Sequence, residues 1–325
     1  MSWFLLSVSM ATFLMVATSS IGHGNTKFLM DNVLVLTVLH GSETSRVLLT
    51  CEQVHQDQDV FWKKDGEIQP HLKGHQINVE IWEVNGGNFS CHSSSSGQYL
   101  SHTLVLVQVQ NGTMDILEGG RYKDALHCWA YNYNGSFHCK WTRTRSRSQA
   151  KVLMFKAHRH SEPLPCQLDS STSEANCLDM SCSYREEQKH VHLSLYIFNA
   201  YKLEVYTKAF YLRDIVRPEA VPGLHSVGAK KFQWGYPESW QRPCTFFGLT
   251  FQVKLVDGDD SCSTNSFIST AETDASSYVA DVDVSDFGFC VRAQDKHTRG
   301  LWSHWSSCRV IGGKAHCGPH DHQVT

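Results

Sequence analysis

After its first residues the sequence has no apolar run long enough to cross a membrane, for which about 20 residues are needed. The run at the start, Trp3 to Val16, is shorter and is followed by the small residues Ala17-Thr18-Ser19. This pattern predicts a signal peptide over residues 1–19, although no Lys or Arg precedes the apolar run. We therefore expect a secreted, extracellular protein without a membrane span.

The sequence also lacks the motifs that mark common enzymes. It contains no Gly-rich phosphate loop, no nucleophile elbow and no pair of carboxylates in a recognisable catalytic motif. None of the 19 histidines forms an H-E-x-x-H arrangement, and the C-terminal His316, Cys317, His320 and His322 have no recognised metal-ligand spacing. We expect no catalysis, no metal and no cofactor, and a net charge of −3 gives no indication of nucleic-acid binding.

Twelve cysteines and three N-glycosylation sequons fit the oxidising route of a secreted chain. The sequons are at Asn88, Asn111 and Asn134, and each tripeptide alone is weak evidence. The hydrophobic content of 41% with 19% charged residues is typical of globular domains, and 325 residues are enough for two or three of them.

Residues 24–110 are predicted to form an immunoglobulin-like (Ig-like) sandwich. Cys51, Trp62 and Cys91 have the spacing with which a tryptophan packs against an inter-sheet disulfide in that fold. Phe89 stands where a tyrosine is usual, so this corner of the sandwich lacks the tyrosine hydrogen bond. Short β-prone runs predict strands at residues 32–39, 46–51, 60–63, 77–82, 88–92 and 103–109.

A second β-rich block covers residues 116–215. Cys128 and Cys139 lie on either side of a polar Asn-Gly turn, so a hairpin would place them opposite each other as a disulfide. Trp141 completes a C-x-W pattern on the same strand face as Cys139. Further strands are expected at residues 191–198 and 201–212.

A proline-containing linker over residues 213–224 leads into a third β-rich block, residues 220–310. Cys290 and Cys308 lie symmetrically about residue 299, so a hairpin there would pair them. Spacing gives no partner for Cys244, Cys262 or Cys317, and residues 311–325 are expected to be a polar, disordered tail. Strands are predicted at residues 231–234, 246–255, 266–269, 277–282 and 287–293.

The third block ends in the motif W-S-x-W-S: Trp302, Ser303, Trp305 and Ser306 around His304. Serine after each tryptophan favours an exposed strand face, on which Arg292 or Arg299 could stack between the indoles by cation–π contacts. The alternative is that the two tryptophans simply fill a core. The motif resembles the signature of the class I cytokine-receptor family, which implies that this block is a fibronectin type III domain and that C-x-W marks another.

The chain as a whole resembles the receptor-like subunits of secreted heterodimeric cytokines. Short phrases outside the main motifs carry the same resemblance, among them Trp234-Gly235-Tyr236-Pro237 and Val291-Arg292-Ala293-Gln294-Asp295. The resemblance implies an all-β fold of one Ig-like sandwich followed by two fibronectin type III-like sandwiches. It also implies a four-helix-bundle alpha subunit as partner and a class I cytokine receptor on the target cell, for which the Ig-like domain stays free.

The resemblance assigns Cys166 and Cys177 to a disulfide within the second block and Cys182 to an interchain disulfide with the alpha subunit. By spacing alone, Cys166 could instead pair with Cys182. A surplus thiol in an oxidising compartment tends to find a partner, so a disulfide-linked homodimer is a second assembly to consider.

The resemblance also places Asp295 at the tip of a hairpin that faces the helical partner, where it would pair with an arginine. His297 and Thr298 follow it where the family has aromatic residues. Apolar contacts with the partner are expected from Tyr201, Phe246 and Phe247, any of which could equally belong to a core.

Three other functions are alternatives. A soluble decoy or alpha-type receptor would capture a helical cytokine reversibly and would need no surplus cysteine. An adhesion protein would have no use for a complete W-S-x-W-S, and a metalloenzyme would bind stoichiometric zinc. The basic run from Arg143 to Arg147, with Lys151, is of the kind that attracts glycosaminoglycan sulfates, although such runs are also common on solvated surfaces.

Overall fold

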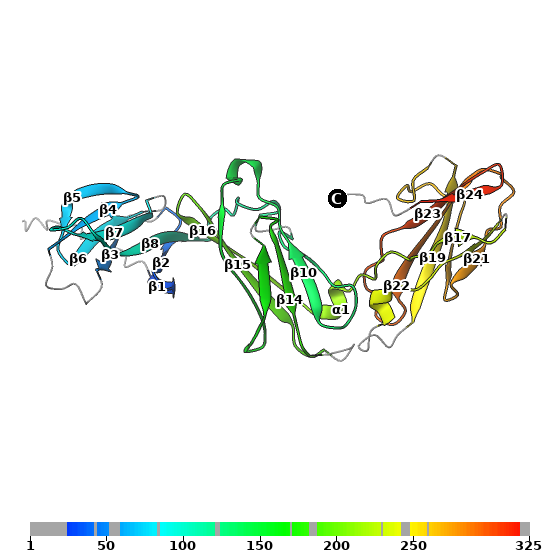
Figure 1. The fold of residues 1–325 in the computed structure, drawn as a ribbon, viewed down its shortest axis with the longest axis horizontal. Helices are drawn as coiled ribbons and strands as arrows, with labels where there is room; N and C mark the ends of the chain where they lie inside the picture. Colours follow the sequence, from blue (N-terminus) through cyan, green and yellow to red (C-terminus); the bar gives the residue numbers. More distant parts are fainter. Residues whose placement is uncertain are drawn as a thin grey trace, which may run out of the picture. The chain divides into compact units, whose positions relative to one another are not determined.

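The computed structural model describes residues 25–41, 44–51, 59–82, 85–120, 124–169, 171–181, 187–228, 230–241, 248–258 and 260–318. The fold is all-β, as predicted, and forms two compact units (Figure 1). Unit 1 comprises residues 1–112 with 200–203, and unit 2 comprises residues 113–199 with 204–325. No helix among the described residues is long and apolar enough to span a membrane. The predicted signal peptide lies outside the described residues.

Unit 1 is the Ig-like sandwich. One sheet has the order β1–β2–β8–β7–β4–β5 and the other pairs β3 with β6. The predicted Cys51–Cys91 disulfide is present, with 6.1 Å between the Cα atoms. Trp62 is buried among the core residues and its indole N–H donates to the carbonyl of Gly74. The strands are β1 (Asn25–Met30), β2 (Val33–Leu39), β3 (Ser45–Thr50), β4 (Val60–Lys64), β5 (Glu67–Lys73), β6 (Gln76–Ile81), β7 (Gly87–Ser93) and β8 (Tyr99–Gln110).

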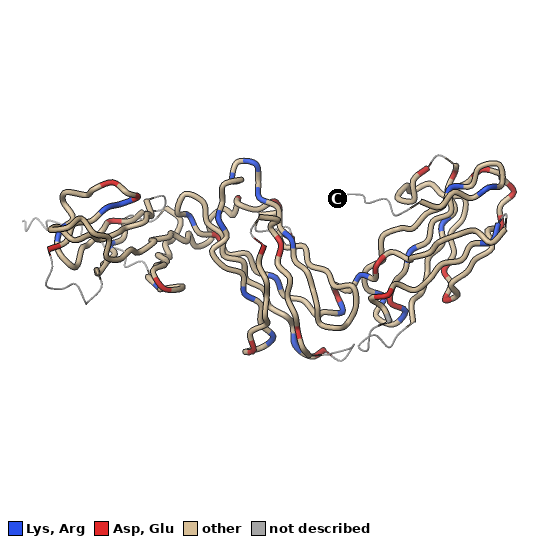
Figure 2. Tube along the Cα trace, viewed as in Figure 1, with Lys and Arg blue, Asp and Glu red and all other residues tan. Residues whose placement is uncertain are grey.

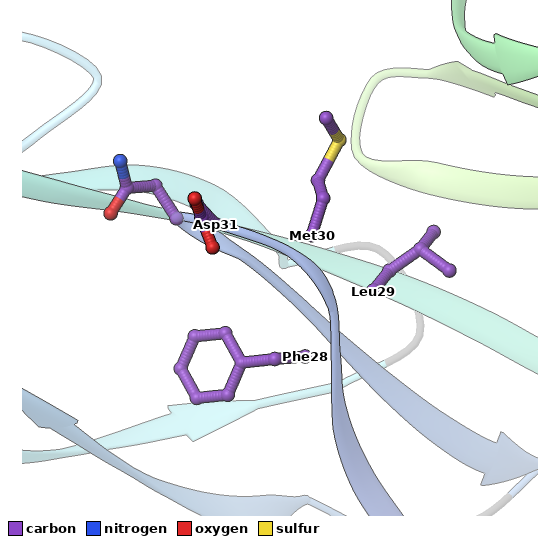
Figure 3. Close-up of a pocket in the computed structure, with 5 residues that line it drawn as sticks. Phe28, Leu29, Met30 and Asp31 are labelled. Atoms are coloured by element: carbon purple, nitrogen blue, oxygen red, sulfur yellow. The ribbon is translucent and has the colours of Figure 1, made fainter.

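Two strands of unit 1, β1 and β5, were not predicted, and in the described residues both are edge strands of their sheet. β1 pairs only with β2 and is almost wholly exposed, so it carries no alternation of buried and exposed residues. β5 contains Pro70, which a sheet tolerates at an edge but which breaks a strand pattern in sequence. The β1–β2 hairpin also forms a pocket lined by its own residues 28–32 (Figure 3).

The first sandwich of unit 2 packs the sheet β12–β11–β15–β16 against the sheet β13–β14–β10–β9. Phe137 meets Phe210 edge to face across the core, with 5.7 Å between ring centroids, and Trp141 stacks on Phe155 at 5.8 Å. The Trp141 of C-x-W is therefore a core residue. The strands are β9 (His127–Trp129), β10 (Ser136–Lys140), β11 (Lys151–Arg159), β12 (Glu162–Leu164), β13 (Cys166–Asp169), β14 (Glu174–Leu178), β15 (Val191–Asn199) and β16 (Lys202–Phe210).

Two predicted disulfides of this sandwich are confirmed. Cys128 is paired with Cys139 across the β9–β10 hairpin, as its Asn-Gly turn predicted. Cys166 is paired with Cys177 across β13 and β14, which excludes the pairing of Cys166 with Cys182. Cys182 itself lies outside the described residues.

The second sandwich of unit 2 packs the sheet β17–β18–β21 against the sheet β20–β19–β22–β23–β24. Phe232 stacks on Phe289 between them, with 3.9 Å between ring centroids. The strands are β17 (His225–Ser226), β18 (Lys231–Gln233), β19 (Leu249–Asp257), β20 (Ser269–Thr273), β21 (Ser277–Val279), β22 (Phe287–Asp295), β23 (Ser306–Ile311) and β24 (Lys314–Cys317).

The predicted pairing of Cys290 with Cys308 is wrong. The register of β22 and β23 places Cys290 opposite Ser307 and Cys308 opposite Phe289. Because successive residues of a strand point to opposite faces, this one-residue offset puts the two cysteines on different faces of the sheet. Cys290 pairs instead with Cys262, and Cys308 pairs with Cys317.

The Cys308–Cys317 disulfide also corrects the prediction for the C-terminal tail. Residues 314–317 form β24, which pairs with β23 across a turn at Gly312 and Gly313. Both glycines are exposed and have positive φ, a backbone conformation that glycine adopts without steric cost and that a tight hairpin turn requires. The tail is polar, as expected, but its first part is a strand of the sheet.

Candidate functional site

The turn between β9 and β10 meets the turn that follows β22, within unit 2. The hydroxyl of Tyr133 donates to Asp295 Oδ2 at 2.8 Å and lies 3.1 Å from Thr298 Oγ1. Asn132 Nδ2 donates to the carbonyl of Ser239 at 2.6 Å. The ring of Trp240 packs edge to face on Tyr133. These contacts hold the loops of the two sandwiches together as one loop surface.

Asp295 organises the turn after β22. It is buried, and its Oδ1 accepts the backbone N–H groups of His297 at 2.6 Å and Thr298 at 3.1 Å. Burial raises the pKa of Tyr133 well above its usual range, and the neighbouring Asp295 carboxylate acts in the same direction while the Thr298 hydrogen bond opposes it. Tyr133 therefore stays protonated and able to donate, and Asp295 reaches a partner's arginine only if Tyr133 or the turn moves.

The other residues expected to contact a partner are not assembled around Asp295 in the described structure. Phe246 and Phe247 lie outside the described residues, as does Cys182. Tyr201 belongs to unit 1, where its hydroxyl donates to Asp65. Burial, followed by the Asp65 carboxylate, raises the pKa of Tyr201 to about 12. The exposed residues on the turn after β22 are Lys296, His297 and Arg299.

The W-S-x-W-S motif forms a cation–π stack on the surface of the second sandwich. The Arg292 guanidinium lies 4.8 Å from the ring centroid of Trp302 and 4.4 Å from that of Trp305, and Lys254 lies 5.9 Å from Trp305. Both indoles are half-buried, so they do not fill a core. Arg299, the other candidate for the stack, is instead 4.0 Å from Glu272 on the surface.

The serines of the motif are buried, contrary to the expected polar surface. Ser303 pairs with Ala293 through its backbone N–H, and its hydroxyl accepts the Ala293 N–H at 2.8 Å. Ser306 donates its hydroxyl to the carbonyl of Val221 at 2.8 Å. The serine hydroxyls thus provide hydrogen-bond partners for the buried backbone groups of Ala293 and Val221.

We expect Arg292→Met to lower the free energy of unfolding of the second sandwich by about 2 kcal/mol, because two cation–π contacts and the hydrogen bond from Arg292 to Gln252 are lost. Hydrogen exchange of β22 and β23 in urea would measure the change. Arg299→Met is the control, and its exposed side chain predicts a change within about 0.5 kcal/mol. Equal effects of the two substitutions would contradict a structural role for the stack.

A buried ion cluster lies next to the β9–β10 turn, where the Asp179 N–H donates to the carbonyl of Gly135 at 2.9 Å. Arg159 on β11 donates to Asp179 Oδ2 at 2.6 Å and to Glu187 Oε1 at 2.8 Å. Glu187 in turn accepts the first backbone N–H groups of the helix α1 (Leu212–Ile215), from Leu212 and Arg213, at 2.9 Å each. The cluster joins β11, the segment after β14 and α1.

The sequons and the basic run lie on the surface of their units. Asn88, Asn111 and Asn134 are all exposed, which glycosylation requires. In the basic run, Arg143 bonds to Ala150 and Ser173, and Arg147 pairs with Asp115. The run therefore has internal partners, and basic and acidic residues are interspersed along both units (Figure 2).

Among the described residues, no group of three or more His, Cys, Asp or Glu side chains could hold a metal ion. Of the four C-terminal residues considered as ligands, Cys317 is in a disulfide and His316 is on β24.

The described residues thus form an Ig-like sandwich, a sandwich that carries C-x-W and a sandwich that carries W-S-x-W-S. Residues 123–199 match the family described as the C-terminus of the cytokine interleukin-12p40. The chain is 29% identical to interleukin-12 subunit beta of Mesocricetus auratus, over 81% of this chain and 85% of the relative. It is 26% identical to interleukin-12 subunit beta of Homo sapiens, over 80% of this chain and 85% of the relative.

The resemblance to interleukin-12 subunit beta is thus confirmed along most of the chain. The matches support a cytokine subunit, and the relatives form a non-enzymatic family.

Proposed function

We propose that the chain is the receptor-like binding subunit of a secreted heterodimeric cytokine. Its partner is a four-helix-bundle alpha subunit, interleukin-12 alpha-like or interleukin-23 alpha-like, and the pair acts on a class I cytokine receptor. The similarity to interleukin-12 subunit beta over about four fifths of the chain is the observation that carries this proposal.

The loop surface of unit 2 supports the same function. Tyr133 and Asp295 fix the β9–β10 turn and the turn after β22 to each other. A partner that docks there meets loops that are already ordered, which lowers the conformational entropy lost on binding. We assign Lys296 and His297 to this contact surface because they are exposed on the turn after β22. Phe246 and Phe247, which lie outside the described residues, stay proposed as apolar contacts.

A covalent link through Cys182 makes the assembly permanent. Cys166 and Cys177 bond to each other, so neither competes for that role. The segment after β14 that precedes Cys182 is anchored by Asp179, whose Oδ1 accepts the N–H of Ser181 at 3.0 Å.

Co-expression with an interleukin-12 alpha-like or interleukin-23 alpha-like subunit tests the proposal. We expect a secreted heterodimer on a non-reducing gel that separates into two chains when reductant is added. The Cys182→Ser variant should still co-purify with the alpha subunit, but every complex should run as separate chains without reductant. Analysis of the secreted chain expressed alone distinguishes a monomer from a disulfide-linked homodimer.

Two results would contradict the proposal. A chain that stays monomeric beside each alpha subunit would indicate a soluble receptor that captures a cytokine reversibly. Loss of secretion in Cys182→Ser, when the chain is expressed alone, would show that the thiol serves the fold of the chain and not its partner.

A further inference from the structure

The turn between β9 and β10 divides its residues into two sets. Asn132 and Tyr133 are buried, and both are tied to the second sandwich, through Ser239 and Asp295. Tyr131 and Asn134 are exposed, with 38% of the Tyr131 surface accessible. The inward pair fixes the turn, so the outward pair is held in a defined position.

Tyr131 ends a row of three aromatic rings on the outer face of this hairpin. Its ring centroid is 5.7 Å from that of His138, which stacks on Trp129 at 5.5 Å with an interplanar angle of 22°. His138 and Trp129 are a cross-strand pair, and His138 is held from the other side by Asn176 at 2.6 Å. The row is therefore an ordered, partly apolar surface.

Asn134 is the acceptor of a sequon, three residues after Tyr131. Its side-chain Oδ1 accepts the N–H of Ser136 at 2.9 Å. The amide nitrogen, which takes a glycan, lies on the opposite side of the same carboxamide from that oxygen. Residues 130–135 connect β9 to β10, and only Tyr131 and Asn134 among them are exposed. A glycan on Asn134 thus begins on the same turn as the exposed ring of Tyr131.

We propose that the first N-acetylglucosamine of a glycan on Asn134 packs against the ring of Tyr131 and covers the start of this aromatic row. A pyranose ring has one face of C–H groups and a rim of polar groups, so it can bury apolar area on an aromatic ring while its polar groups stay in water. The covalent attachment gives the sugar a high effective concentration at this surface.

The rest of the sheet face fits a sugar better than a protein partner. Apart from the exposed Leu178, the outward residues of β10 and β14 beside the row are polar, and they include an ion pair of Lys140 with Glu174 at 3.0 Å. The centre of a stable protein interface is usually depleted of charge. A polar rim around a short aromatic row matches the chemistry of a tethered carbohydrate.

The inference rests on secretion, which belongs to the proposed function, and its test keeps the two apart. The chain would be secreted with high-mannose glycans, and peptide mass spectrometry would measure occupancy at Asn134. An endoglycosidase would then trim each glycan to a single N-acetylglucosamine. Hydrogen exchange of residues 128–139 would be compared between the trimmed chain and Ser136→Ala, which removes the sequon but keeps the hydrogen bond from the residue 136 N–H to Asn134 Oδ1.

We expect Asn134 to be occupied, and exchange in the hairpin to be about threefold slower in the trimmed chain than in Ser136→Ala. In a Tyr131→Ala background the same comparison should show no difference. Asn111→Gln, at the sequon that directly follows β8, is the control and should leave exchange of residues 128–139 unchanged.

An unoccupied Asn134 in a secreted chain would overturn the inference and leave secretion intact. An equal slowing by the sugar in the Tyr131→Ala background would also overturn it, because the contact would then not involve the ring. Failure of secretion would instead contradict the proposed function.

Discussion

Arg159→Met should lower the free energy of unfolding of unit 2 by about 3 to 5 kcal/mol, which is the range for breaking a buried ion pair by removal of one partner. The substitution leaves Asp179 and Glu187 without their cation, and their side chains are 2% and 0% exposed. Burial lowers the pKa of Arg159, but its hydrogen bonds to Glu187 and Asp179 outweigh that effect and raise it. The guanidinium is therefore charged, and the two carboxylates depend on it.

Urea unfolding of the intact secreted chain, followed by hydrogen exchange of β11 and β15, would measure this loss. Lys140→Met is the matched control on the same sandwich, because Lys140 and its partner Glu174 are 54% and 36% exposed. An exposed pair is worth at most about 1 kcal/mol. If Arg159→Met changes stability no more than Lys140→Met does, the cluster does not hold β11, Asp179 and α1 together.

Gly135→Ala should also destabilise unit 2, by about 3 kcal/mol or more. Gly135 has a φ of +92°, and a Cβ there would lie 1.7 Å from the carbonyl oxygen of Asp179. The backbone must move, and that motion breaks the 2.9 Å hydrogen bond from the Asp179 N–H to the Gly135 carbonyl. The variant keeps an Asn-x-Ser sequon at Asn134, so the substitution does not remove this glycosylation site.

Gly228→Ala separates the steric clash from the cost of the backbone angle. Gly228 has a φ of +108°, also in unit 2, but a Cβ there would meet no atom within 4 Å. It should cost about 1 kcal/mol, the price of a left-handed conformation alone. The same exchange measurement would compare Gly135→Ala with Gly228→Ala. Equal losses in the free energy of unfolding would show that the backbone at Asp179 moves away from the new Cβ at little cost. Because Gly135 and Arg159 both act on Asp179, their combined effect should be less than the sum.

Most of the fold could be predicted from local patterns. The alternation of apolar and polar residues gave the majority of the strands, and the Cys51, Trp62 and Cys91 spacing gave the Ig-like core. The Asn-Gly turn between Cys128 and Cys139 gave a disulfide because a short turn fixes the register of its hairpin.

The Cys290 pairing failed where the turn no longer fixes the register. The chain between β22 and β23 runs from Lys296 to Trp305 and contains the W-S-x-W-S motif, so a symmetric hairpin was a poor approximation there. A difference of one residue was enough to move Cys308 to the other face of the sheet. The partner of Cys308 then came from β24, a strand with too few apolar residues to show in the sequence.

The candidate site was predicted less completely, because burial depends on contacts between distant segments. Sequence placed Asp295 at the start of a turn, but its buried position comes from Tyr133, which is 162 residues away. Ser306 of W-S-x-W-S is buried for a similar reason, since its hydroxyl donates to the carbonyl of Val221, 85 residues away. Arg159, Asp179 and Glu187 belong to no motif, and only the fold brings them together.

The Cys308–Cys317 disulfide closes the last hairpin and so affects how proteolysis of this protein would be seen. A protease that cuts the exposed turn at Gly312 and Gly313 would leave both fragments joined by the disulfide. The nicked chain would keep its full mass on a gel without reductant, and an affinity tag placed after Cys317 would still recover it. Intactness of the C-terminal end can therefore be judged only after reduction.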